Sequence, residues 1–315
     1  MMRPLLNWLS PEGQEARLSI LIFHRVLPSP DPLFPDEMHA ERFCRTCGWL
    51  KGWFNVLPLR EASRRLADGT LPARALSITF DDGYADNHDV ALPILLEHGL
   101  SATFFVSTGF TDGGRMWNDT LIEAVRGATG DGLDLSALGL DGLGSVSLRT
   151  WQERRQAVDQ LIKACRYLPM AQREAATQAV ARKAGGKLPS ALMMNRDQLR
   201  ALHTQGMELG GHTVTHPILA RLPIDEARTE ISTGKLALES LLQSPVTSFA
   251  YPNGRPGEDY LQAHVDMVKE LGFVAAVTTA WGVSRRSSDR HQLPRFTPWD
   301  RGRLAFGLRL AKNLV

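Results

Sequence analysis

The chain has 315 residues, of which 43% are hydrophobic and 22% are charged, and its formal net charge is +2. This composition is that of an ordinary soluble globular protein, and the balanced charge argues against a dedicated nucleic-acid-binding protein. Three cysteines cannot all pair, so the sequence shows no disulfide framework and a reducing compartment is favoured. The length suits one large α/β barrel or two small domains.

The amino-terminal residues contain an apolar run, Leu5 to Leu9, that follows Arg3 but is broken by Asn7. A secretory signal needs about 7–15 apolar residues. A transmembrane helix needs about 20, and no run in the chain approaches that length. We therefore expect a cytoplasmic protein, and we leave open a position at the inner face of the membrane.

After a polar lead-in over residues 1–16, strand and helix patterns alternate along the first part of the chain. The expected elements are a buried strand at 18–24, helices at 41–54 and 57–66, a strand at 75–80, a helix at 87–98 closed by Gly99, and a strand at 102–106. Alternating strands and helices are typical of a parallel α/β sheet or barrel.

Between residues 111 and 205 the strand pattern stops and helix patterns dominate. Helices are expected at 119–126, 148–167, 171–184 and 196–204, with a glycine-rich, weakly structured stretch at 130–144. We interpret 111–205 as a helical insertion that shapes a substrate cleft, within a single domain that spans residues 1–315. Beyond it, strands are expected at 207–210, 247–251, 273–278 and 292–296, and helices at 223–243 and 258–271.

Two adjacent carboxylates, Asp81 and Asp82, follow the strand at 75–80. Neighbouring side chains on a strand point to opposite faces, so both can serve one site only where the strand ends and the chain turns. Gly83 permits such a turn. Two anions this close repel each other, and a cation bound to one of them relieves the repulsion.

Two histidines, His212 and His216, lie four residues apart and are closed by Pro217. Proline disfavours a helical backbone at the residue before it, so we place the pair on a loop at a strand end. Two imidazoles and one carboxylate form a three-ligand site with an open position for water, as catalytic zinc sites do. The alternative is a pair of polar loop histidines without a metal.

Residues 79–84 (Thr-Phe-Asp-Asp-Gly-Tyr) and 212–216 (His-Thr-Val-Thr-His) resemble the first and second motifs of the polysaccharide deacetylase family, the NodB-homology carbohydrate esterases. The resemblance runs from about Leu18 to Pro298, and it implies a distorted (β/α) barrel of about seven strands. It implies that Asp82, His212 and His216 hold a divalent metal, Zn²⁺ or another ion such as Co²⁺ or Ni²⁺. It also implies that Asp81 is the general base and that the reaction removes an N-acetyl group from an amino sugar.

Residues 249–254 (Phe-Ala-Tyr-Pro-Asn-Gly) resemble the third motif of the family, a wall of the substrate groove. Many members have an arginine in this segment that holds the base, and the matching position here is Ala250. Arg295, on a later predicted strand, is a candidate replacement, and a surface ion pair is its alternative role. The substrate-binding residues that we predict are Tyr84, Tyr251, Pro252, Arg295 and Trp117.

The late histidine of the family, usually the general acid, has no clear counterpart in this sequence. His24 ends a predicted strand, in a segment like one seen in the exopolysaccharide deacetylases of the family. We favour His24 as the catalytic acid over a structural histidine. His291 is the other candidate, but its polar surroundings indicate an exposed loop.

Trp117 opens the predicted insertion and offers an aromatic face on which a sugar ring can stack. Trp281 and Trp299 offer the same, and for all three the alternative is packing in the core. The end of the chain is basic, and only Asp289 and Asp300 oppose its cations. These cations suit an anionic lipid headgroup, a lipid-linked phosphate or an acidic glycan, or else they form a solvated face.

The function that we predict is a metal-dependent hydrolase that removes N-acetyl groups from an amino sugar in exopolysaccharide or lipid-linked glycan synthesis. Its expected partners are an N-acetylated glycan or a lipid-linked sugar, together with peripheral membrane contact and no nucleic acid. One alternative is hydrolysis of another C–N amide bond, such as that of a formamido sugar. The other is a non-catalytic glycan-binding protein, which the alanine at position 250 and the missing late histidine favour.

Overall fold

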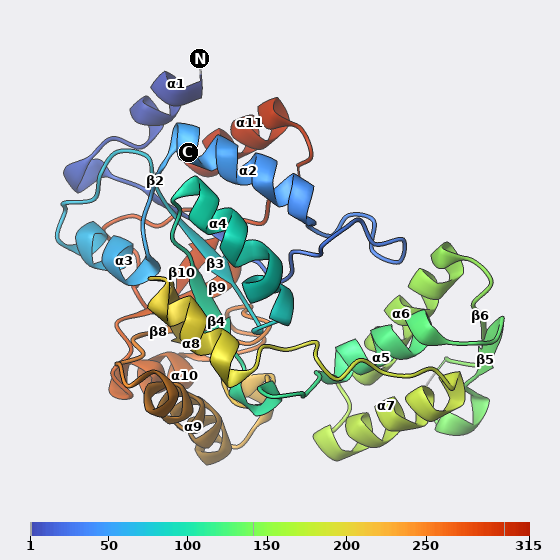
Figure 1. Cartoon of the computed structure of the whole chain (residues 1–315). Helices are drawn as coiled ribbons and strands as arrows, with labels where there is room; N and C mark the ends of the chain where they lie inside the picture. The colour runs from blue at the N-terminus through green and yellow to red at the C-terminus, as the bar shows by residue number, and fades with distance from the viewer. Residues whose placement is uncertain (1, 141, 299) are drawn as a thin grey trace. The chain divides into compact units, whose positions relative to one another are not determined.

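Seven parallel strands with helices packed around them form a nearly closed barrel (Figure 1). The structure is a computed structural model that describes every residue except Met1, Asp141 and Trp299. In their order around the barrel, the strands are β1 (Leu18–Phe23), β3 (Ala75–Phe80), β4 (Thr103–Val106), β7 (Glu208–Gly211), β8 (Ser248–Ala250), β9 (Ala275–Trp281) and β10 (Leu293–Arg295). A short additional strand, β2 (Asn55–Val56), pairs with the start of β3.

The barrel is closed between its first and last strands by a bridge between Leu21 and Phe296, beyond the end of β10. The amide of Ile22 donates to the carbonyl of Phe296 at 3.1 Å, and the amide of Phe296 donates to the carbonyl of Ile20 at 2.7 Å. The prediction of a distorted (β/α) barrel of about seven strands is therefore confirmed.

Helices follow the strands and cover the outside of the barrel, as parallel connections require. They are α2 (Ala40–Trp53), α3 (Leu59–Ala67), α4 (Leu92–His98), α8 (Arg196–Thr204), α9 (Ile224–Leu242) and α10 (Gln262–Glu270). All six were expected from the sequence within a few residues. A π-helical turn at Asn87–Ala91 precedes α4 inside the helix predicted at 87–98.

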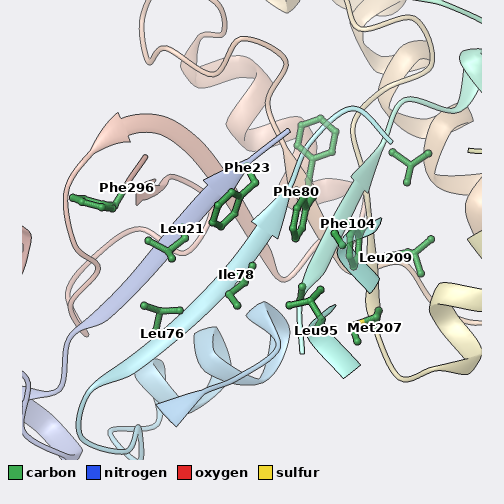
Figure 2. Packing of buried hydrophobic residues seen from close by; sticks show 14 of the residues in the cluster. Leu21, Phe23, Leu76, Ile78, Phe80, Leu95, Phe104, Met207, Leu209 and Phe296 are labelled. Carbon is green, nitrogen blue, oxygen red and sulfur yellow. The ribbon is translucent and has the colours of Figure 1, made fainter. Parts of the chain in front are cut away.

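Alternation along β3 sorts its side chains into two environments. Leu76, Ile78 and Phe80 belong to the large apolar cluster between the strands and the surrounding helices (Figure 2). Ser77 and Thr79 are buried on the other face of the strand. If the alternation continues past the end of the strand, Asp81 lies on the same face as Thr79. Its carboxylate therefore points toward the interior of the barrel.

The chain divides into two compact units, of which the barrel is the first. The second contains residues Pro30–Glu37 and Gly113–Leu192 and has its own apolar core. Its elements are α5 (Trp117–Gly127), β5 (Gly132–Asp134), β6 (Ser145–Ser147), α6 (Trp151–Cys165) and α7 (Met170–Ala184). The stretch at 130–144, expected to be weakly structured, contributes β5, which forms a short antiparallel pair with β6.

The sequence prediction was wrong at the amino terminus and missed the last helix. Residues 1–16, predicted as a polar lead-in, contain helix α1 (Met2–Leu9), in which Leu6 and Leu9 are buried. A proline in the first turn is compatible with a helix, because the amide that it lacks has no helical partner there. Helix α11 (Arg303–Asn313) was not predicted, and it buries Phe306 and Leu310 against the barrel.

Candidate metal centre and active site

Three side chains from two strand ends meet at one rim of the barrel. Asp82 follows β3, and His212 follows β7, with β4 between these two strands. Backbone hydrogen bonds join these ends, from Ser107 to the carbonyl of Asp82 at 3.2 Å and from His212 to the carbonyl of Val106 at 3.2 Å. The carboxyl ends of parallel strands lie on the same rim, which explains why residues far apart in the sequence converge.

The carboxylate of Asp82 faces both imidazoles. Its Oδ1 atom lies 3.3 Å from Nε2 of His212 and 3.5 Å from Nε2 of His216. The three groups can each offer one ligand atom, and these atoms lie within 4.8 Å of one another. Asp82 and His212 are buried, whereas the side chain of His216 is 18% exposed. The cluster therefore has an enclosed side and an accessible side.

The backbone at the end of β3 is bent by two consecutive residues with positive φ. Asp82 has φ = 77° and Gly83 has φ = 93°. Aspartate tolerates this conformation better than most residues, and glycine adopts it freely. Because of this turn, the side chains of Asp81 and Asp82 point in different directions.

The tautomer of His212 is fixed by the backbone of a neighbouring strand. Nδ1 lies 2.7 Å from the carbonyl oxygen of Ala250, which only accepts hydrogen bonds, so Nδ1 carries the hydrogen. In the neutral ring, Nε2 then presents a lone pair to Asp82. The lone pairs of His212 Nε2 and Asp82 Oδ1 then face each other and repel, unless a proton or a metal ion lies between them.

A metal ion fits this arrangement. Oδ1 of Asp82 is buried and has no hydrogen-bond partner among the described residues. Buried polar atoms are rarely left in this state. Two imidazole nitrogens and one carboxylate oxygen, with one side accessible, are a donor set that zinc and similar divalent ions bind.

The ionisation states of Asp82 and His216 also suit metal binding. Burial opposes ionisation of Asp82, but its contact with His212 and the charge of His216 outweigh burial and hold the pKa of Asp82 well below its usual range. Burial lowers the pKa of His216 to about 4. Burial acts in the same direction at His212, but its contact with Asp82 prevails and raises the pKa of His212. At neutral pH, Asp82 is therefore an anion and His216 a neutral ligand, the forms that bind metals.

The loop that carries the two histidines is anchored by Glu230, on helix α9. The carboxylate of Glu230 accepts hydrogen bonds from the amides of Val214 and Thr215 at 2.9 and 2.8 Å, and from the hydroxyl of Thr215 at 2.8 Å. Within the loop, the amide of His216 donates to the hydroxyl oxygen of Thr213 at 3.1 Å. These bonds fix the backbone that leads into His216.

Helix α9 can approach this loop closely because of Gly234. A Cβ atom at position 234 would lie 2.8 Å from the carbonyl oxygen of Thr213. Gly234 lies one helical turn beyond Glu230, so the close approach and the carboxylate anchor occur on the same part of the helix.

Asp81 is held by a bidentate ion pair with Arg295. The two terminal guanidinium nitrogens donate to the two carboxylate oxygens, each at 2.7 Å. Arg295 also donates to the carbonyl of Thr278 at 2.8 Å and to the hydroxyl of Thr79 at 3.2 Å. Asp81 is 3% exposed and Arg295 is 1% exposed. Arg295 thus contacts the carboxylate directly from β10, and it is no surface residue.

Burial would favour the neutral form of Asp81, but the charge of Arg295 and its hydrogen bonds prevail. They hold the pKa of Asp81 below its usual range. Asp81 is therefore a carboxylate at neutral pH, with both oxygens oriented by the guanidinium plane.

His24 follows β1 at the rim that also carries Asp81. The amide of Asp81 donates to the carbonyl of Phe23 at 2.9 Å, and the side chain of Asn87 donates to the carbonyl of His24 at 2.8 Å. The ring of His24 is exposed, and its charge is among the smaller causes that lower the pKa of Asp81 and of Asp82. The structure thus places His24 and Asp81 at neighbouring strand ends on one rim.

His291 lies elsewhere. It precedes β10, so it is at the amino end of that strand, whereas the cluster is at the carboxyl ends. Its Nε2 contacts the carbonyl of Phe273 at 2.9 Å, and its own carbonyl accepts from Tyr251. The side chain is only 17% exposed, so the expected exposed loop position does not describe it well.

The predicted substrate-binding residues near the rim are largely enclosed. The ring of Tyr84 is buried beneath Arg25, whose guanidinium lies 4.7 Å from the ring centroid. Tyr251 is buried, stacks on Tyr260 with ring centroids 3.8 Å apart, and donates its hydroxyl to the carbonyl of His291 at 3.0 Å. Pro252 is buried as well. Their roles in substrate binding remain predictions.

The roles of the tryptophans also remain predictions. Trp117 belongs to the second unit, where it packs beside the apolar core and has the guanidinium of Arg173 5.0 Å from its ring centroid. Trp281, at the end of β9, is 56% exposed. Trp299 lies outside the described residues.

Sequence reasoning missed the role of Glu230 and the hydrogen bond between Arg295 and the hydroxyl of Thr79. A signal for Glu230 is present, because it lies between Ala227 and Ile231, which are buried on α9. A carboxylate next to the apolar stripe of a helix needs a partner, and the sequence does not show which one.

A sequence model of a family described as polysaccharide deacetylase matches residues 68–139 and 147–276. This match includes Asp81, Asp82 and both histidines of the cluster. His24 and Arg295 lie outside the matched residues.

Known proteins with similar sequences and structures agree with that match. The chain is 21% identical over 290 residues to YxkH of Bacillus subtilis (strain 168), a protein named after the same family, and the alignment covers 91% of this chain and 73% of YxkH. The fold resembles that of the Streptococcus pyogenes deacetylase PplD, solved with acetate, with a TM-score of 0.62, 20% identity, and coverage of 95% of this chain and 99% of PplD. It also resembles IcaB of Ammonifex degensii, with a TM-score of 0.58, 18% identity, and coverage of 97% and 98%. At these identities, the structural likeness concerns the fold.

Proposed function

This chain belongs to the polysaccharide deacetylase family, and from that premise we propose that it is a metal-dependent hydrolase that removes N-acetyl groups from an amino sugar. The substrate that we propose is an exopolysaccharide or a lipid-linked glycan precursor. The observation that carries the proposal is the pairing of two adjacent carboxylates with different partners. Asp82 faces two imidazoles, while Asp81 is bound by Arg295.

Asp82, His212 and His216 would hold the divalent metal, with zinc as the ion that suits the donor set best. When bound, such an ion lowers the pKa of water and polarises a carbonyl group. The chain itself contributes the orientation of the ligands, through Ala250 at His212 and through Glu230 at the loop that carries His216.

Asp81 is the residue that we assign as the general base. It lies next to Asp82 in the chain, and Arg295 keeps it ionised and fixes both of its oxygens. Its lowered pKa makes it a weak base, so it accepts a proton effectively only from water that has itself been made more acidic. The role therefore depends on the metal ligands that lie beside it.

His24 is the residue that we assign as the general acid. An amide is a poor substrate unless its leaving nitrogen is protonated, and an imidazole can give a proton near neutral pH. The His24 ring is exposed at the rim, where a bound sugar can reach it. The hydrogen bonds from Asn87 and Asp81 hold the backbone at this strand end.

The structure removes one argument for a non-catalytic glycan-binding protein. The alanine at position 250 leaves no side chain for the base, but Arg295 makes a bidentate contact with Asp81 from another strand. A binding protein has no need for a buried, oriented carboxylate beside three metal ligands. We therefore retain hydrolysis as the proposed function and make binding an outcome of the test.

The test uses zinc-loaded protein and a panel of N-acetylated and N-formylated amino sugars, from monomers to oligomers. Released acetate and formate are measured, with a chelated sample and an Asp81→Asn variant as matched controls. We expect acetate release that is lost in both controls. Formate release alone would show that the substrate is a formamido sugar. Saturable glycan binding without either product would identify a binding protein.

In the described part of the chain, we find no helix with the length and apolar character needed to cross a membrane. A cytoplasmic location, at the face of the membrane where lipid-linked precursors are made, is part of the proposal. Fractionation of cells that produce the protein, with the membrane and the cytoplasm assayed separately, tests it.

A further inference from the structure

Helices α1 and α11 expose apolar side chains on the faces that point away from the barrel. Trp8 is 79% exposed and Leu5 is 39% exposed on α1, while Leu304 and Leu308 of α11 are 66% and 52% exposed. Each helix also has a buried apolar face, formed by Leu6 and Leu9 in α1 and by residues such as Phe306 in α11. A helix that only packs on a barrel is polar on its outer face, whereas these two also carry leucine and tryptophan side chains there.

The two helices are neighbours, so their outer faces belong to one surface (Figure 1). Met2 of α1 packs on Gly307 of α11, where a side chain would collide with it. Trp53, at the end of α2, lies beside the same glycine. Between the helices is a groove of about 810 Å³, lined by Met2, Arg3, Leu5, Gly52, Trp53, Arg303, Leu304 and Leu308. We call Leu5, Trp8, Leu304 and Leu308, with this groove, the α1/α11 surface.

The exposed charges of the two helices are positive. Residues 1–11 contain Arg3 and no acidic residue, and residues 301–315 contain four basic residues, of which Arg309 pairs with Asp300 at 3.1 Å. Arg3, Arg303 and Lys312 are exposed, and the guanidinium of Arg303 lies 5.4 Å from the ring centroid of Trp53. The apolar residues are thus bordered by cations.

We propose that the α1/α11 surface binds a lipid bilayer that contains anionic phospholipid. Short helices with leucine and tryptophan on one face and bordering arginine or lysine are the pattern that lies in the interface of a membrane. Tryptophan prefers that interface because one side of its ring system is apolar and the other donates a hydrogen bond. The cations add attraction to anionic headgroups.

The position of this surface leaves the catalytic rim free. Gly52 and Trp53 precede β2, which pairs with β3 at Ala75, the first residue of that strand. Asp81 follows the other end of β3, a strand about 20 Å long. A protein bound through the α1/α11 surface therefore does not cover the metal ligands with lipid.

The experiment is flotation of the purified full-length chain with vesicles of phosphatidylcholine alone or of phosphatidylcholine mixed with phosphatidylglycerol. We expect binding to the mixed vesicles and a loss of binding in high salt. Leu304→Gln combined with Leu308→Gln, and separately Arg303→Glu combined with Lys312→Glu, should each weaken binding about tenfold or more. Matched controls are Leu236→Gln, a leucine that is 63% exposed on α9, and Lys163→Glu on α6. They should bind as the wild type does.

A second measurement tests whether helix α1 contacts the bilayer. Trp8 fluorescence should shift to shorter wavelength on mixed vesicles, and Trp8→Phe should remove this shift while keeping most of the binding. Equal binding by all variants, or no binding to mixed vesicles, would overturn the proposal. So would a dimer in sedimentation without lipid that the Leu304→Gln/Leu308→Gln variant dissociates, because the surface would then join two copies of the chain. None of these readouts depends on catalytic activity.

Discussion

His212 donates its Nδ1 hydrogen to the carbonyl oxygen of Ala250, with 2.7 Å between the two atoms. The alanine at position 250 offers no side-chain donor to Asp81, yet its backbone carbonyl orients a proposed metal ligand. Since this bond keeps the hydrogen on Nδ1, Nε2 is free to bind a cation beside Asp82. One position can thus lose its side-chain role and keep a backbone role.

Loss of either imidazole should remove the metal. We expect His212→Ala and His216→Ala to lose most bound Zn²⁺ after loading and dialysis, because two ligands hold the ion much less tightly than three. Inductively coupled plasma mass spectrometry measures the metal, and circular dichroism checks the fold. His291→Ala, which changes a histidine outside the cluster, should keep full occupancy. Full occupancy in both ligand variants would contradict the assignment.

Removing the base should separate metal binding from turnover. Asp81→Asn keeps the size of the side chain but cannot take a proton, so we expect metal occupancy to be retained and the rate to fall ~10²–10⁴-fold. The rate of acetate release and the metal content are measured on the same preparation. A nearly wild-type rate with metal bound would show that another group is the base.

The ion pair of Asp81 and Arg295 should be costly to break from one side. Arg295→Met leaves a buried carboxylate without its cation, and we expect the free energy of unfolding to fall by about 3–5 kcal/mol. Adding Asp81→Leu removes the unpaired charge, so the double variant should regain part of that stability while staying inactive. Urea denaturation of the wild type, the two single variants and the double variant measures this. Strictly additive losses would mean that the two side chains do not interact.

The proposed role of His24 as the general acid can be tested by comparing substrates with different leaving groups. His24→Ala should damage hydrolysis of an N-acetyl amide more than hydrolysis of an activated acetate ester, because the ester's leaving group needs no proton. His291→Ala should show no such selectivity. Equal losses on both substrates for His24→Ala would indicate a positioning role, and an amide-selective loss for His291→Ala would move the acid role to that residue.

Glu230 should tune metal affinity without touching the metal. Glu230→Gln weakens the acceptor for the amides of Val214 and Thr215, and we expect Zn²⁺ affinity to fall about 10–100-fold. Competition with a fluorescent chelator measures the affinity. Glu226→Gln, on the exposed side of the same helix, is the matched control and should bind Zn²⁺ as the wild type does. An unchanged affinity in Glu230→Gln would show that the loop holds its shape without this anchor.

The sequence predicted the strands of the barrel well, because a buried parallel strand is a nearly continuous apolar run. The three residues of the cluster, Asp82, His212 and His216, were named as candidate ligands because they follow predicted strands and match the motifs of the family. The sequence left two roles open for Arg295, replacement of the arginine missing at position 250 or a surface ion pair, and the structure shows it in contact with Asp81. What these residues do in catalysis remains a prediction.

Other features depend on choices between long-range partners that a local pattern does not encode. Glu230 faces the loop at 214–215 only because Gly234 lets the helix approach it. Helix α1 spans eight residues and contains both a proline and an asparagine, so its periodicity was too short to detect. In α11, basic residues lie between the leucines, so the pattern did not indicate an amphipathic helix.

The closure of the barrel by its last strand has a consequence for how the protein is made. Asp81 is synthesised 214 residues before Arg295, so the ribosome delivers every metal ligand before the cation that accompanies the base. Until β10 docks and Phe296 bridges to β1, the interior of the barrel contains a carboxylate without a counter-charge. A nascent chain that has folded only through β9 should therefore be able to take up metal while remaining unable to turn over substrate, so activity appears only after β10 has docked.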